Sequence, residues 1–155
     1  MKAIKILLIP AILLCGVSAH AARLEVEVEK DTRLPIGYVN IVIQGGSVAD
    51  PENRLGLTQF MSQMLLRGTK SLTKEQIDLK LDQWGAQLGI ENRAEYMIIR
   101  GAALSNRLQD LLGLIEDIVL HPSFSETEIR KLKAETISSL MEELSSDHAV
   151  NTKKF

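Results

Sequence analysis

The amino-acid sequence predicts an α+β domain in which helices pack on an antiparallel sheet. Two stretches with strand-like patterns come first, two helical stretches follow, and this succession then repeats. The predicted order is therefore strand, strand, helix, helix, strand, strand, helix, helix (ββααββαα). Strands that come in adjacent pairs, with helices grouped between them, are typical of an antiparallel sheet covered by helices.

The first two strands are expected at residues 24–29 and 36–44. Residues Leu24–Glu29 alternate strictly between apolar and acidic side chains, which is the pattern of a half-buried strand. Residues Ile36–Gln44 are rich in β-branched and aromatic side chains and are expected to form a more central strand. Gly45-Gly46 ends this strand, and a loop beginning at Asp50 leads into the first helix.

The first helix is expected from about Arg54 to about Arg67. Its apolar residues recur at i, i+3, i+4, i+7 and i+8, so one stripe should face a core and the polar residues should lie opposite. The stripe comprises Leu57, Phe60, Met61, Met64 and Leu65, and the opposite face carries Gln59, Ser62 and Gln63.

A second helix and a hairpin are expected next. Thr73 and Gln76 have the spacing of a capping box, which opens a helix, and Gly85 is expected to end that helix. Residues 87–91 and 94–101 are then expected to pair as antiparallel strands joined around Asn92-Arg93.

Two further helices complete the predicted fold. Ser105 is expected to cap a third helix, which His121-Pro122 stops because proline cannot continue it. Ser125 and Glu128 have the spacing of a second capping box, for a final helix that runs to about Leu144.

The N-terminus has the pattern of a secretory signal peptide, expected at residues 1–21. Lys2 and Lys5 supply positive charge, an apolar stretch covers 6–17, and Ala19-His20-Ala21 fits an A-x-A cleavage site. The apolar stretch is shorter than the ~20 residues that span a bilayer. The mature chain is therefore expected to comprise residues 22–155, resident in the periplasm of a Gram-negative bacterium and not in its membrane.

Removal of this leader changes the charge and the cysteine count. It takes away Cys15, the only cysteine, so the mature chain can form no disulfide. It also removes two lysines, which leaves 16 basic against 20 acidic residues and a net charge of −4. An acidic chain argues against nucleic acid as a partner, because phosphate binding needs a basic face.

Few side chains of the mature chain have a pattern that indicates chemistry. Its two histidines, His121 and His148, are 27 positions apart and have no partner at a metal-ligating spacing. His121 is interpreted as a residue that satisfies the last carbonyls of a helix, and His148 as a surface loop residue. The serine pairs at 138–139 and 145–146 have no histidine or lysine arranged to activate them.

The most informative stretch is Gly56–Thr69, which reads GLTQFMSQMLLRGT. It resembles the signature of the pitrilysin/insulinase-type zinc peptidases, the inverzincins, whose helix reads Gly-apolar-Ala-His-Phe-Leu-Glu-His-Met-Leu-Phe-x-Gly-Thr. In that family the two histidines bind zinc and the glutamate acts as general base on a zinc-bound water. Gln59 and Gln63 stand at the histidine positions, and Ser62 stands at the glutamate position. An amide is a poor zinc ligand, and a hydroxyl cannot act as a carboxylate base.

A second anchor supports the same resemblance. His121-Pro122-x-Phe124, followed by Glu128-Ile129-x-x-Leu132-Lys133, is similar to the family's entry into its long helix. In active members that helix carries the third zinc ligand, a glutamate roughly 75 residues beyond the second histidine. The corresponding position here is Ser139, and a shift of one residue would give Ser138 or Leu140. None of these residues binds zinc, and Glu135 is a lone carboxylate about one turn away.

A substrate position also departs from the family pattern. Peptidase members have Asn-Ala-x-Thr in the strand after the second helix, along which the substrate lies as an added β-strand. This chain reads Gly89-Ile90-Glu91-Asn92 at that place, so the resemblance implies that the substrate-holding asparagine is lost.

The resemblance implies that the chain forms the first part of a LuxS/pitrilysin-like metalloenzyme domain and stops partway through it, at Phe155. It favours a catalytically silent homologue without zinc or another cofactor, acting as the non-catalytic subunit of a periplasmic peptidase. The implied partner is a zinc-bearing paralogous subunit, with a peptide substrate between the two. The alternatives are an active zinc endopeptidase with atypical ligands and a nonfunctional truncated remnant.

Overall fold

The computed structural model describes residues 6–7, 25–26 and 34–152, which divide into two units, 1–35 and 36–155. In the first unit, strands β1 (Ile6–Leu7) and β2 (Glu25–Val26) pair antiparallel, with Ile6 opposite Val26. The strand expected at 24–29 is thus seen at 25–26 alone. Its other positions, and most of the leader expected at 1–21, lie outside the described residues.

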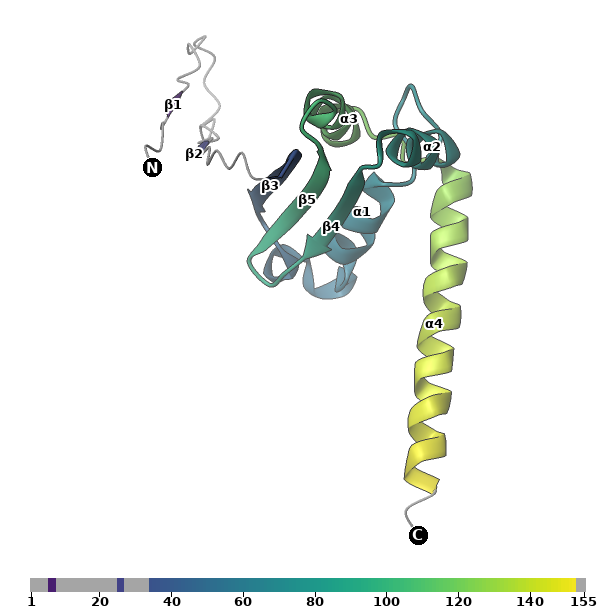
Figure 1. The fold of residues 1–155 in the computed structure, drawn as a ribbon. Helices are drawn as coiled ribbons and strands as arrows, with labels where there is room; N and C mark the ends of the chain where they lie inside the picture. Colours follow the sequence, from purple (N-terminus) through teal and green to yellow (C-terminus); the bar gives the residue numbers. More distant parts are fainter. Residues whose placement is uncertain (1–5, 8–24, 27–33, 153–155) are drawn as a thin grey trace. The chain divides into compact units, whose positions relative to one another are not determined.

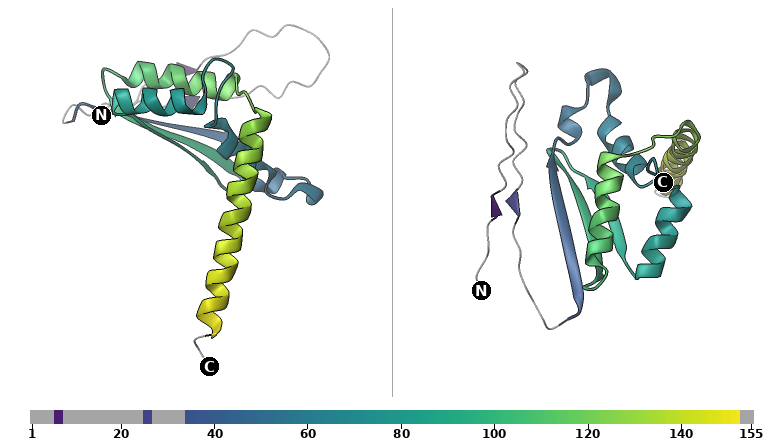
Figure 2. Two further views of the ribbon diagram at one scale, coloured as in Figure 1. Left: turned by 90° about the vertical axis from the view of Figure 1, so that its right-hand side faces the viewer. Right: turned by 90° about the horizontal axis from the view of Figure 1, so that it is seen from above.

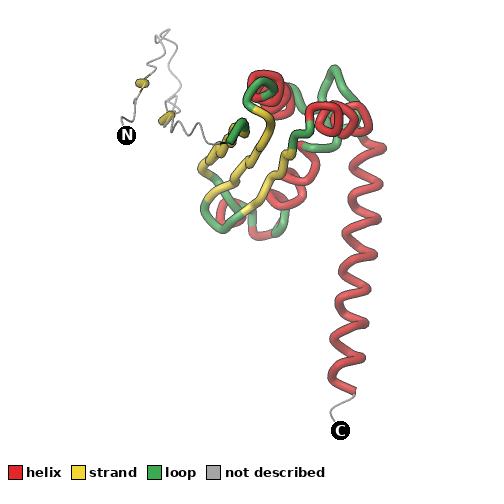
Figure 3. Tube along the Cα trace, viewed as in Figure 1, coloured by secondary structure: helices red, strands yellow, loops and turns green. Residues whose placement is uncertain are grey.

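The second unit contains a three-stranded antiparallel sheet with helices, which confirms the predicted α+β class (Figures 1 and 3). The strand order is β3-β5-β4, with Ile36 opposite Leu104 and Gln87 opposite Ala102. The strands are β3 (Ile36–Gln44), β4 (Gln87–Asn92) and β5 (Tyr96–Leu104). The helices are α1 (Leu57–Leu65), α2 (Lys74–Trp84), α3 (Leu108–Leu120) and α4 (Glu126–Thr152).

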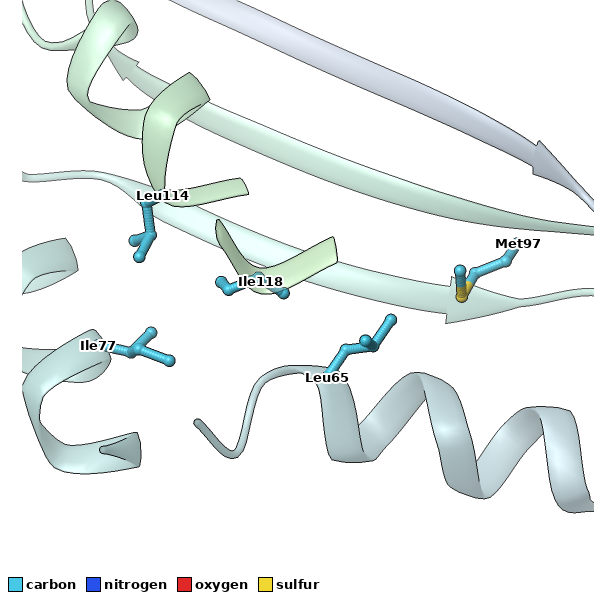
Figure 4. Close-up of a cluster of buried hydrophobic side chains, with 5 residues drawn as sticks. All are labelled: Leu65, Ile77, Met97, Leu114 and Ile118. Atoms are coloured by element: carbon cyan, nitrogen blue, oxygen red, sulfur yellow. The ribbon is translucent and has the colours of Figure 1, made fainter. Parts of the chain in front are cut away.

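The core lies on one face of this sheet, where α1, α2 and α3 cover the strands (Figure 2). One buried cluster joins α1, α2, α3 and β5, and its side chains point toward one another in Figure 4. A second cluster packs α3 directly on β5. The first cluster comprises Leu65, Ile77, Met97, Leu114 and Ile118, and the second Ile99, Ala103, Leu111 and Ile115.

Gly101 in β5 allows α3 to approach the sheet closely. A Cβ at this position would lie 2.7 Å from Val39 Cγ1 and 3.0 Å from Leu111 Cδ2. Contacts this short do not occur between unstrained atoms, so a larger residue would force the helix away from the strand.

The position of β3 in the sheet differs from the prediction. Among the described residues β5 is the central strand, and β3 pairs only with β5. One face of β3 is exposed, and Tyr38 and Val42 on that face are 69% and 60% accessible. A sequence rich in β-branched residues suits any pleated strand, so composition alone did not distinguish a central strand from an outer one.

The expected start of α3 was also wrong. Ser105 does not cap this helix, because the N-cap is Arg107, which makes no side-chain capping bond. Strand β5 continues to Leu104, and residues 105–107 form a turn in which the Arg107 amide donates to the Leu104 carbonyl at 2.7 Å. The turn leaves Ser105 two residues too early to cap the helix. His121 ends α3, as predicted.

Helix α4 is longer than expected and contains His148, which is therefore not a loop residue. No glycine or proline interrupts residues 126–152, so nothing in the chain ends the helix near Leu144. Its capping box forms only in part. The Ser125 hydroxyl accepts from the Glu128 amide at 3.3 Å, but the Glu128 carboxylate is engaged in ion pairs. Within the described residues, no helix is both long and apolar enough to cross a membrane.

Replacing Leu111 by alanine should lower the free energy of unfolding by about 2–5 kcal/mol, because Leu111 is fully buried between α3 and β5. The matched control is Leu112→Ala. Leu112 is the next residue of the same helix and is 37% exposed, so its replacement should cost less than about 1 kcal/mol. Urea unfolding followed by circular dichroism measures both, and equal losses would contradict the described packing.

Candidate functional site

Helix α1 carries the residues at the family's catalytic positions, and Asp50 fixes where it begins. The N-cap is Gly56, whose φ of 88° favours glycine. The Asp50 carboxylate accepts from the Gly56 amide at 2.8 Å, from the Thr58 amide at 2.9 Å and from the Thr58 hydroxyl. These bonds, above all the one from the Thr58 hydroxyl, lower the pKa of Asp50. Helix α1 therefore starts at Leu57 and not at Arg54, which lies in a separate short 3-10 helix.

Ser62 is buried, contrary to the expectation that it lies on a solvated face with Gln59 and Gln63. It is 1% exposed, and its hydroxyl donates to the Gln59 carbonyl at 2.7 Å. Gln59 and Gln63 are exposed, as predicted. Leu57, expected in the core stripe, is 44% exposed, whereas Met64 and Leu65 are buried. The buried face of α1 is therefore rotated relative to the predicted stripe, so that it includes Ser62 and excludes Leu57. The small side chain of Ser62 fits this tightly packed position.

A cavity of about 560 Å³ lies between α1, α2, β4 and α4. Three of the four positions singled out from the sequence, Ser62, Gln63 and Ser139, line this cavity, although 76 positions separate Gln63 from Ser139. Gln59 does not line it. The remaining walls combine apolar and charged side chains, namely Leu66, Arg67, Lys74, Asp78, Ile90, Leu132, Glu135, Thr136 and Leu140.

Arg67 joins the end of α1 to α4 at the edge of this cavity. Its guanidinium donates to Glu128 at 3.4 Å and makes two hydrogen bonds to the Glu135 carboxylate. The pKa of Glu135 is lowered by the hydrogen bond from Arg67, and that of Arg67 is raised by the same bond. Lys131 binds the other oxygen of Glu128 at 2.6 Å. Glu135 is therefore bound by a cation, an ion pair that the sequence pattern did not predict.

The side chains that line the cavity do not fit a zinc ion. Zinc sites in proteins use thiolates, imidazoles and carboxylates, three or four of them converging on one point. Gln63 offers an amide, while Ser62 and Ser139 offer hydroxyls. The two carboxylates, Asp78 and Glu135, already bind Lys74 and Arg67. Within the part of the chain that the structure describes, no three His, Cys, Asp or Glu residues form a group that could hold a metal.

Strand β4 borders the cavity and holds the position of the expected substrate residue. Gly89, which stands at the family's asparagine position, lies in β4, and the following residue, Ile90, lines the cavity. Among the described residues β4 pairs only with β5, so its other edge has no partner strand. An edge of this kind can accept an extended peptide as an added strand.

The two sequence anchors of the resemblance meet in space. The loop after α1 bonds to the end of α3, with the Lys70 amide donating to the His121 carbonyl at 2.8 Å. The Ser123 amide donates to the Gly68 carbonyl at 3.1 Å, and Thr69 pairs with Pro122 as an isolated β-bridge. Gly68 has a φ of 133°, which requires glycine. Backbone hydrogen bonds therefore hold the two motifs together, and none of these contacts involves a metal.

Asp117 holds this junction together through its side chain. It accepts from the Ser71 hydroxyl at 2.8 Å, and its other oxygen lies 3.3 Å from His121 Nδ1. His121 satisfies one of the last helix carbonyls, as predicted, because its amide donates to the Asp117 carbonyl at 2.9 Å, and its ring in addition contacts the Asp117 carboxylate. Hydroxyls of Thr69 and Ser71 lower the pKa of Asp117, with His121 contributing less.

Asp117 should make the stability depend on pH in the acid range. A carboxyl whose pKa is lower in the folded state adds stability above its unfolded pKa of about 4, and this stability is lost as the pH falls through the folded value. Asp117→Asn should therefore lower the melting temperature at pH 7, and the difference from the wild type should shrink at about pH 3. Glu126→Gln on the first turn of α4 serves as the control. A difference that stays constant with pH would contradict this role for Asp117.

The chain that carries these residues is similar to known proteins. A family model described as "Insulinase (Peptidase family M16)" matches residues 25–154. The chain is similar to a non-peptidase homolog, YmxG, of Helicobacter pylori, with 24% identity over 123 residues that cover 79% of this chain and 28% of the relative.

Two further relatives carry peptidase names. An uncharacterised zinc protease of Rickettsia bellii is 29% identical over 93 residues, which cover 60% of this chain and 23% of the relative. The mitochondrial-processing peptidase subunit beta of Homo sapiens is 24% identical over 113 residues, which cover 73% of this chain and 23% of the relative. The chain spans about a quarter of the length of the curated relatives that it matches.

Proposed function

The chain belongs to the insulinase family of peptidases (peptidase family M16), and from this membership we propose that it is a catalytically silent member, the non-catalytic subunit of a zinc peptidase assembly. The main support for the proposal is that Ser62, Gln63 and Ser139 line one cavity and offer hydroxyls and an amide in place of zinc ligands. In this proposal the cavity shape is retained, and neither the metal ligands nor the general base is present.

Ser62 is the residue that most strongly argues against catalysis. A general base must have a free lone pair and a pKa near the working pH. The Ser62 hydroxyl is buried and donates a hydrogen bond to the Gln59 carbonyl, and an alcohol is far too weak a base to replace a carboxylate.

The partner in this proposal is a paralogous subunit that carries the zinc. One relative is named as a non-peptidase homolog and another as a subunit of a processing peptidase, which supports a role within an assembly. The edge of β4 that has no partner strand in the described part of the chain lies beside the cavity, and through it this chain would help to hold a peptide. The signal-like pattern at residues 1–21 supports a periplasmic location.

An active peptidase with atypical ligands is the second candidate, because two carboxylates line the cavity. Asp78 lies 2.6 Å from Lys74 Nζ, and Glu135 is bound by Arg67. A zinc ion would have to displace both cations and would still lack an imidazole or thiolate ligand. The silent subunit is therefore preferred.

The purified protein is expected to contain no stoichiometric zinc and to hydrolyse no peptide. Metal analysis and an assay with a pool of fluorogenic peptides, with and without EDTA, test this expectation. EDTA-sensitive hydrolysis that co-elutes with the protein would establish the active alternative.

Restoring the ligand types should restore zinc binding. The triple variant Gln59→His/Gln63→His/Ser139→Glu supplies two imidazoles at i and i+4 of α1 and a carboxylate from α4. It should bind about one zinc ion per chain by calorimetry. The control Gln59→His/Gln63→His lacks the third ligand and should bind at least about tenfold more weakly. A folded triple variant that binds no zinc would show that these positions do not form a metal site.

A further inference from the structure

Strand β3 is an outer strand of the described sheet and contains no charged residue. Among the described residues it pairs with β5 alone, so the other side of its backbone has no partner strand there (Figure 1). Outer strands usually carry a charged residue or a proline, which prevents pairing with another chain. The opposite outer strand, β4, contains Glu91, which binds two arginines. Residues 36–44 contain neither a charge nor a proline, so the edge of β3 is suited to pairing with a further strand.

We propose that this edge pairs with the β3 edge of a second copy of the chain, antiparallel and with Asn40 opposite Asn40. The strand runs from Ile36 to Gln44, so a two-fold pair centred on Asn40 matches all nine residues. Both ends of the strand lie within described residues, because Pro35 precedes it and Gly45, whose φ is 108°, follows it. A shift by one residue would set exposed side chains opposite covered ones, and a shift by two would leave residues unpaired.

The side chains of β3 are complementary to themselves in this register. On the exposed face, Tyr38 of each copy lies opposite Val42 of the other, and pairs of an aromatic and a β-branched side chain stabilise antiparallel strands. On the face that the helices cover, Val39 lies opposite Ile41, and both side chains are only partly buried within one copy. The pairing therefore covers apolar surface on both faces of the strand and sets no like charges opposite each other.

The helices leave room for this pairing. Helix α3 packs on β5, so the two copies of α3 lie on the same face of the joined sheet, three strand spacings or about 14 Å apart. Packed helices need only about 8–10 Å between their axes. The joined sheet has six strands, a common size, and β4 is its outer strand at each end. The pairing does not depend on the proposed function, because β3 contains none of the degenerate catalytic positions.

Sedimentation equilibrium of the full chain tests the pairing. The wild type should dimerise, and Asn40→Lys should raise the dimer Kd at least about tenfold at low salt, because it sets two ammonium groups opposite each other. The matched control is Gln44→Lys, at an exposed position of the same strand that lies opposite Ile36, and it should change the Kd less than about threefold. Circular dichroism checks that each variant is folded. A wild type that stays monomeric at about 200 µM would overturn the proposal and favour another strand of the same chain at this edge. Equal effects of the two lysines would also overturn it.

A disulfide between two copies tests the register. In a Cys15→Ser background, Asn40→Cys supplies the only thiol of the chain. Opposite residues of an antiparallel pair have Cα atoms about 4.5–5.5 Å apart, within the reach of a disulfide, so mild oxidation should link the chains into a dimer. The matched control in the same background is Val42→Cys, which is also exposed but lies about 13 Å from its own counterpart. It should not link alone, but it should link to an equal amount of the Tyr38→Cys variant. A dimer in which Asn40→Cys stays unlinked would overturn the proposal.

Discussion

Burial of helix α3 against the sheet positions the other elements of the second unit. This helix supplies Leu114 and Ile118 to the cluster shared with α1 and α2, and Leu111 and Ile115 to the cluster on β5. The close approach at Gly101 fixes its distance from the sheet. The end of α3 in turn fixes the loop after α1 through hydrogen bonds at Gly68 and Lys70. The cavity is therefore placed by apolar packing and backbone hydrogen bonds, neither of which needs a metal.

The fold could be predicted from the sequence wherever its signals are local. The capping box of Thr73 and Gln76 forms as expected, with Gly85 in the left-handed conformation at the end of α2, because these contacts span only a few residues. The bounds of β3 match the prediction for the same reason. Strand order within the sheet was not predictable, since it depends on pairing between distant segments. The central position expected for β3 and the start expected for α3 were therefore wrong. Among the described residues β5 lies between β3 and β4, and it extends to Leu104 opposite Ile36, which delays the start of α3.

The candidate site was predictable to a similar extent. The family resemblance named Gln59, Ser62, Gln63 and Ser139, and all of these except Gln59 line one cavity. The bonds that organise the cavity were not predictable, because Arg67 is 61 positions from Glu128 and 68 from Glu135. Asp50 likewise caps α1 from six to eight positions away, outside the spacing of a capping box. Ser62 was expected on a solvated face because periodicity alone does not show how far a helix is rotated.

In the proposed function, this chain retains the fold of a peptidase without its chemistry and acts beside a subunit that has both. Native mass spectrometry of the tagged protein, purified from the periplasm of the cells that produce it, tests this most directly. We expect a complex of unequal subunits in which zinc accompanies the other subunit and this chain is metal-free. A chain that carries its own stoichiometric zinc would contradict it.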